Sequence, residues 1–212
     1  MAHNLKKFQT ENDYTAATLN YPAVSWIVSG DTIHFDKTAP VAPMVGDIRV
    51  TYNIADTSEE VKLYNGGGGS GSGSESEGGQ SESGSGSGFA PTQMWVDGVE
   101  ETVVGTWRFD TTGLHVVEFK LDGTEIPNAA FYQMGTITKV EIGNNITVIG
   151  ESSFSYPLIL INITVLATTP PALGGAAFDG SSCPIYVPSA SVNTYKAASG
   201  WNTYASRITA IV

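Results

Sequence analysis

Few side chains in this sequence have the types and the spacing that catalysis or metal binding requires. The histidines His3, His34 and His115 lie far apart and form neither a His-x-His pair nor a His-Glu-x-x-His motif, so we expect no metal site. We expect His115 at the surface, just before a strand. The chain has no Gly-x-Ser-x-Gly motif, and its Gly-Ser runs lack the flanking strand and helix of a phosphate-binding loop. We therefore predict a protein that is not an enzyme and uses no cofactor.

The nearest approach to paired-carboxylate chemistry is the acidic cluster of Asp97, Glu100 and Glu101. Asp97 precedes Gly98, and this dipeptide is typical of a tight hairpin turn. These carboxylates therefore fit a solvated hairpin face better than a general acid–base pair. Cys183 is the single cysteine, which excludes an intramolecular disulfide and a cysteine-rich zinc site. We expect its thiol to be buried as a small apolar group.

Tryptophans are the best candidates for contact with a ligand. Trp95 and Trp107 flank the predicted hairpin and could form an aromatic platform for a glycan or a protein, with packing in the core as the alternative interpretation. Trp26 lies in an apolar strand pattern and Trp201 in a C-terminal motif, and we expect both in the core.

A repeat of about 23 residues organises the second half of the chain. Its recurring apolar positions are Leu114, Ile137 and Leu160; Val117, Val140 and Ile163; Phe119, Ile142 and Val165; Ile126, Ile149 and Leu173; and Phe131, Phe154 and Phe178. A period in the low twenties is typical of a solenoid, whose coils are stable only when stacked on one another. Apolar and polar residues alternate at the first positions of each coil, which predicts half-buried strands.

These strands should stack at one strand per coil into a parallel sheet. The predicted strands lie near Val116–Leu121, Thr138–Ile142, Ile161–Val165 and Ile185–Val187. The phenylalanine column of Phe131, Phe154 and Phe178 should fill the interior between this sheet and the opposite wall.

Coil motifs and C-terminal motifs together resemble a known family. One coil combines Thr138–Ile142 with Ile146–Gly150 and Phe154, and the end of the chain contains Pro184–Pro188 and Tyr195–Trp201. On these motifs, residues 114–212 resemble the BspA-type leucine-rich repeats, and their end is similar to the C-terminal cap of such proteins in gut Bacteroidetes and their phages. The resemblance implies a short capped solenoid that displays a binding surface.

The pattern of residues 1–64 predicts a small module that is separate from the coils. Thr10 can cap a short helix over Glu11–Thr18. Strand-like runs follow at Val24–Val28, Thr32–Phe35, Asp47–Tyr52 and Val61–Leu63. The segments Met1–Phe8 and Tyr21–Ile27 resemble the start of structural proteins of crAss-like and related Bacteroidetes phages. That resemblance implies a module that docks on a virus particle.

We predict a mainly β fold with five parts. These are a small β-rich (α+β) N-terminal anchoring module over 1–64, a Gly/Ser-rich flexible linker over 65–88, a β-hairpin cap over 89–113, BspA-like solenoid repeats over 114–188, and a C-terminal cap over 189–212. A flexible linker of this length has a root-mean-square reach of roughly 25–30 Å, so we expect two tethered modules.

The charge and the hydropathy of the sequence limit the kinds of partner that we expect. The net charge is −11 and no basic patch is present, so nucleic-acid binding is not expected. No segment is long and apolar enough to insert into a membrane, and no apolar export segment follows the two N-terminal lysines. Because a virion protein needs no export, the sequence favours a phage origin over a secreted one.

The function that we expect is non-enzymatic display on a phage virion, as a head-fibre-like or tail-fibre-like subunit located in the virion. The N-terminal module would contact other virion proteins, the solenoid would contact a host surface protein or glycan, and the chain should be a homo-oligomer. The alternatives are a bacterial cell-surface adhesin or glycan-binding module outside the cell, and an architectural decoration protein of the virion.

Overall fold

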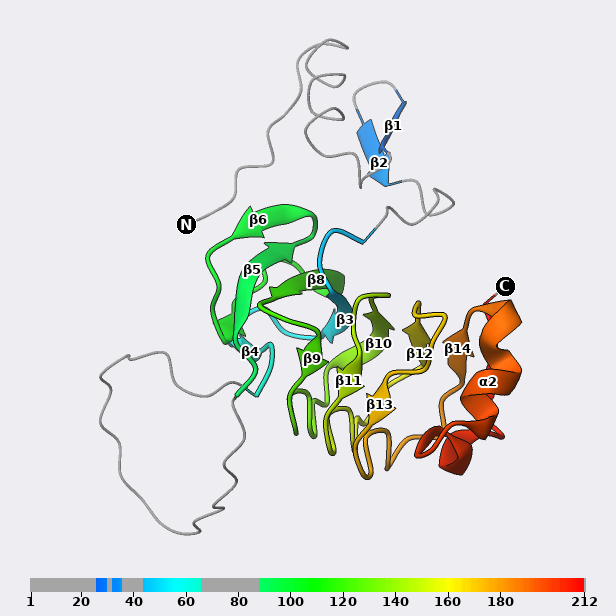
Figure 1. Ribbon diagram of the computed structural model, residues 1–212. Coiled ribbons are helices and arrows are strands. Elements are labelled where there is room, and N and C mark those ends of the chain that lie inside the picture. Colours follow the sequence, from blue (N-terminus) through cyan, green and yellow to red (C-terminus); the bar gives the residue numbers. More distant parts are fainter. Residues whose placement is uncertain (1–25, 30–31, 36–43, 66–87, 212) are drawn as a thin grey trace, which may run out of the picture.

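The computed structural model describes residues 26–29, 32–35, 44–65 and 88–211, and these residues are mainly in strands (Figure 1). The predicted helix over 11–18 and nearly all of the predicted linker lie outside the described residues. Strands β1 (Trp26–Ser29) and β2 (Thr32–Phe35) pair antiparallel, with Ser29 opposite Thr32. The strands predicted near Val24–Val28 and at Thr32–Phe35 are thus neighbours.

A mixed sheet of eight strands forms the largest layer. In their order across the sheet, the strands are β15 (Ile208–Ala210), β14 (Ile185–Val187), β12 (Asn162–Val165), β10 (Ile137–Ile142), β3 (Ile48–Ile54), β8 (Gly113–Leu121), β5 (Pro91–Val96) and β6 (Val99–Glu101). Strands β10, β12, β14 and β15 are parallel neighbours, with Val140 opposite Ile163 and Ile163 opposite Ile185. The parallel pairing predicted from the repeat is therefore confirmed for these strands.

The position of strand β3 contradicts two of our expectations. We expected the strand of Val117 to lie beside that of Val140, and we expected β3 within a separate module that ends at residue 64. Instead β3 lies between β8 and β10, antiparallel to both, so that Val50 is opposite Val117 on one side and Val140 on the other. The alternating side chains Ile48, Val50 and Tyr52 are fully buried. A strand with such an apolar face gains more from a central place in a large sheet than from a small module with a thin core.

A second sheet contains three parallel strands, β9 (Glu125–Ile126), β11 (Val148–Ile149) and β13 (Ala172–Leu173). Figure 1 shows them side by side in a layer separate from the large sheet. Here successive repeat units are direct neighbours, with Ile126 opposite Ile149 and Ile149 opposite Leu173. Strand β3 is therefore inserted between the first two repeat units in the large sheet, whereas the small sheet has no inserted strand.

Stacked turns close the third side of each repeat unit. The backbone amide of Phe131 donates to Ser153 O at 2.7 Å, and that of Phe154 donates to Ala177 O at 2.9 Å. Ala129, Ser152 and Ala176 all have φ near +54°, at the same place in successive units. This regular ladder satisfies backbone groups that a buried turn would otherwise leave without partners.

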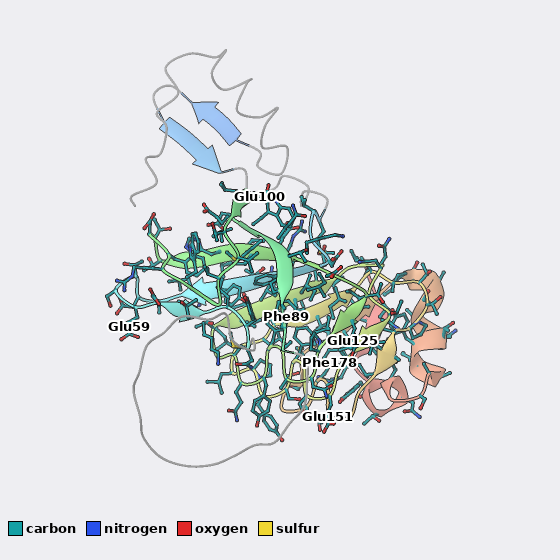
Figure 2. All side chains as sticks on the ribbon, turned by 60° about the vertical axis from the view of Figure 1, so that its left-hand side comes forward. Glu59, Phe89, Glu100, Glu125, Glu151 and Phe178 are labelled. Carbon is teal, nitrogen blue, oxygen red and sulfur yellow. The ribbon has the colours of Figure 1, made fainter. Side chains whose placement is uncertain are left out.

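An aromatic column runs through the interior between the three sides. The rings of Phe131 and Phe154 stack with centroids 5.1 Å apart, and those of Phe154 and Phe178 with centroids 6.0 Å apart. Phe89 extends the column beyond Phe131 at 5.1 Å, and Trp201 extends it beyond Phe178 at 5.6 Å. Figure 2 shows Phe89 and Phe178 in the interior, whereas the labelled glutamates Glu59, Glu100 and Glu151 lie at the periphery.

Both ends of the stack are covered. Strands β5 and β6 form a hairpin beside β8, with Asp97 and Gly98 in left-handed conformations at its turn, as the Asp-Gly signal predicts. At the other end, helix α2 (Val192–Ala197) lies near β15, between two 3₁₀ turns, Ser189–Ser191 and Trp201–Tyr204. A two-stranded sheet of β4 (Val61–Lys62) and β7 (Thr106–Trp107) completes the described strands.

Candidate functional site

Side chains on the outer face of the large sheet form the candidate site. Successive side chains of a strand point to opposite faces of the sheet, so every second residue faces the core and the residues between them face outward. Register aligns the outward residues into one row across the sheet, which we call the outer row: Trp95, Glu118, Arg49, Glu141, Thr164, Tyr186 and Thr209. One strand contributes each residue, so the row collects side chains from distant parts of the sequence.

An ion-pair network centred on Arg49 forms the middle of the outer row. Its guanidinium donates to Glu118 Oε1 through Nε at 3.1 Å and through Nη2 at 3.0 Å, and it reaches Glu141 Oε1 at 3.3 Å. The second oxygen of Glu118 accepts the backbone amides of Val45 and Gly46 at 2.7 and 2.8 Å. Burial raises the pKa of Glu141, and the Arg49 charge opposes that rise. Glu118 is thus fully occupied, whereas Glu141 faces the outer side with part of its surface exposed.

Asp47 fastens the start of β3 to both of its neighbours. Its buried carboxylate accepts from Lys120 Nζ at 2.7 Å, from Asn145 Nδ2 at 2.8 Å and from the backbone amide of Leu121 at 2.7 Å. Its own carbonyl accepts the Gly143 amide at 2.8 Å. These bonds join the end of β8, the start of β3 and the end of β10 into one corner of the sheet.

An open groove of about 580 Å³ lies at this corner. Its lining combines the charged side chains of Arg49, Lys120 and Glu141 with the amide of Asn145 and the apolar side chain of Leu166. Convergent polar groups beside apolar surface are typical of a site that binds a polar organic ligand.

A second, smaller groove of about 320 Å³ lies farther along the same face, lined by Asn162, Thr164, Tyr186 and Ile211. Thr164 is opposite Glu141 on one side and Tyr186 on the other, so the two grooves adjoin along the outer row. We call Arg49, Glu141, Thr164 and Tyr186 the polar strip. It crosses four adjacent strands, a span of about 14 Å at ordinary strand spacing.

The two predicted contact residues, Trp95 and Trp107, are not brought together in one sheet. Trp95 lies on β5 in the outer row, half-buried, opposite Glu118 and Glu100. Trp107 lies on β7 opposite Val61 and packs against the core. The aromatic residue that the polar strip contains is Tyr186, which we did not single out. Its position between the buried Ile185 and Val187 was the signal that could have identified it.

The four predicted core residues Phe131, Phe154, Phe178 and Trp201 are all buried, each at most 1% exposed. Trp201 also donates its indole N–H to Pro171 O at 2.7 Å. Cys183 is buried and unpaired, and burial raises the pKa of its thiol. It therefore offers little thiolate at neutral pH.

His115 is buried, not exposed as we expected. Its Nδ1 lies 2.7 Å from Asp97 Oδ2, and its Nε2 lies 2.9 Å from the Thr111 carbonyl and 3.3 Å from the Thr111 hydroxyl. The ring also packs on Phe109 at 4.5 Å. The expectation failed because His115 lies on the inward face of β8, on the same side as Val117 and opposite the buried Tyr52. Since Nε2 is closer to a carbonyl acceptor than to the hydroxyl, this Asp–His–Thr group is arranged to fix the loop through Thr111 rather than to activate a nucleophile.

Three further observations concern the residues that the structure describes. Among them, no cluster of three or more His, Cys, Asp or Glu side chains is arranged to hold a metal ion. No helix in the described segments has the length and apolarity needed to cross a bilayer. The acidic group that we considered is divided, since Asp97 contacts His115 and Glu100 accepts from Gln93 at 3.1 Å.

Comparison with known proteins adds no identification, because no protein-family model matches the chain and a search of curated proteins finds no match.

Proposed function

We propose that the protein is a non-enzymatic attachment protein that binds a polar ligand, such as a glycan or a polar protein surface, along the polar strip. The observation that carries the proposal is the adjacency of the two grooves on one sheet face, with Tyr186 and Glu141 on either side of Thr164. An aromatic ring offers a flat face to the C–H groups of a sugar, and flanking carboxylate, amide and hydroxyl groups bind its hydroxyls.

In this proposal the repeat units of residues 114–188 form a short solenoid of the leucine-rich-repeat type, closed by the C-terminal cap over 189–212. The three stacked sides, the parallel strands and the aromatic column support it, together with the sequence resemblance to BspA-type repeats. Stacked units suit attachment because they hold side chains from several strands at fixed spacing, so that little ordering entropy is lost when a ligand binds.

We place this attachment protein on a phage virion, with its N-terminal residues in contact with other virion proteins. Support comes from the resemblance of Met1–Phe8 and Tyr21–Ile27 to phage structural proteins. A purely architectural role in the virion is the second candidate. The central position of β3 favours it, because β3 belongs to the same sheet as the repeat strands instead of to a separate module on a flexible tether.

Binding of the full chain should be measured in parallel against neutral and acidic polysaccharides, host cells and virion proteins. We expect Tyr186→Ala to weaken binding to the glycan or cell roughly tenfold or more, as a central aromatic contact should. Lys196→Ala is the control, since Lys196 is exposed on α2 and lines neither groove. Binding to virion proteins alone, with no affinity for cells or glycans, would reject attachment in favour of the architectural role.

A further inference from the structure

An apolar patch lies where the second repeat unit passes into the third. Four of its side chains follow closely in sequence and are unusually exposed for their type: Tyr156 at 52%, Leu158 at 84%, Ile159 at 41% and Ile161 at 58%. The fifth, Tyr132, comes from the preceding unit and contacts Tyr156 edge to face at 6.0 Å. Single exposed apolar residues are ordinary, but a contiguous group of this kind marks an interaction surface.

Backbone contacts hold the apolar patch in place at both ends. The amide of Tyr156 donates to Asp179 O, and the amide of Ile161 donates to Thr138 O, each at 2.7 Å. The ring of Tyr156 lies directly over Gly180, where a Cβ atom would overlap it, and Leu158 lies over Gly135. These two glycines give the aromatic and aliphatic groups a flat support, so the patch is ordered before any partner arrives.

Charge restricts what can cover this surface. Residues 152–178 contain no Asp, Glu, Lys, Arg or His, although the chain as a whole has a net charge of −11. Two copies of such an acidic chain repel each other over most of their surfaces. The patch itself carries no charge, so a contact between two patches brings no like charges of its own together and buries apolar surface.

We propose that the apolar patch is a self-association surface on which a second copy of this chain docks. A two-fold contact places the same patch on both copies, so a single apolar surface is sufficient and no second complementary surface is needed. This inference is independent of the ligand bound along the polar strip, since neither Leu158 nor Tyr156 lines either groove.

Sedimentation velocity of the full chain over a range of concentrations tests the proposal. We expect a monomer–dimer equilibrium whose dissociation constant falls as salt is raised from about 0.05 to 0.5 M, because salt screens the repulsion between acidic copies while the apolar contact persists. An interface built from ion pairs would show the opposite salt dependence, and that result would overturn the proposal.

Leu158→Asp should raise the dissociation constant of the dimer roughly tenfold or more, because it brings two carboxylates into an apolar contact. Leu114→Asp is the matched control, since it makes the same change at another exposed leucine, which is 63% exposed and lies at the start of β8. Both variants should keep the melting temperature of the parent chain, which shows that any loss of association is not a loss of folding. A chain that stays monomeric at all concentrations, or a dimer that both variants weaken equally, rejects the patch as a self-association surface.

Discussion

Phe154 is the side chain through which each repeat unit contacts the next in the interior. Its ring stacks almost parallel on Phe131, with an interplanar angle of 5°, and on Phe178, with an angle of 19°. Phe154→Ala should lower the free energy of unfolding by about 3–5 kcal/mol, because the buried ring leaves a cavity that stacked backbone ladders cannot close. Urea denaturation measures this change. Leu158→Ala, at an exposed position in the same unit, should change it by less than about 0.5 kcal/mol, and equal effects of the two variants would contradict the assigned interior.

Tyrosine ionisation should destabilise the fold at alkaline pH. Burial and a hydrogen bond to Asp179 raise the pKa of Tyr204 to about 12, and burial raises the pKa of Tyr195, whose hydroxyl donates to Ala167 O at 2.7 Å. The unfolded chain releases these protons near pH 10, before the folded chain does. It then binds fewer protons than the native state, so the free energy of unfolding falls as pH rises through and above about 10.

Tyr195→Phe removes one of these hydroxyls and leaves the ring. Its denaturation midpoint should be lower than that of the parent at neutral pH, because Ala167 O loses its donor, but should fall less between about pH 9 and 11. A midpoint that falls equally in both proteins would show that Tyr195 ionises alike in the folded and unfolded states.

At the scale of elements, β3 joins the segment before residue 66 to the repeat units after residue 87. Its fully buried residues Ile48 and Val50 each contribute roughly 1.5–3 kcal/mol by leaving water, and its hydrogen bonds join β8 to β10. If a protease site placed within residues 66–87 is cut, the two fragments should remain together. They should elute as one species in size-exclusion chromatography under native conditions and separate in denaturant. Fragments that separate without denaturant would restore the division into independent modules.

The sequence predicted β3 as a strand but not its place between β8 and β10, and the reason is physical. Alternation in Ile48–Ile54 predicts a strand, and the repeat spacing predicts which strands of residues 137–187 are parallel neighbours, since both are local or periodic signals. Strand partners separated by more than 60 residues follow from total burial, which no local pattern encodes. The outward position of Tyr186 and the inward position of His115, two residues before Val117, were both within reach of the same alternation.

At the scale of the whole molecule, one continuous apolar core extends from the β5–β6 hairpin to the C-terminal turns. Trp201 belongs to the end near α2, whereas Trp95 and Trp107 belong to the opposite end. Because the aromatic column and the backbone ladders connect these ends, the described body should unfold in one cooperative transition.

Tryptophan fluorescence can measure the unfolding of each end of the molecule separately. A variant that retains only Trp201, with phenylalanine at positions 26, 95 and 107, reports on the C-terminal end by fluorescence, while far-UV circular dichroism reports on all strands. We expect the two signals to give the same urea midpoint within each protein, and likewise in the Trp201→Phe variant. A fluorescence change of Trp201 that precedes the loss of circular dichroism would mean that the terminal turns open alone. A single transition would mean instead that β3 and the polar strip belong to one folded unit, so that a force applied through β3 acts on the polar strip as well.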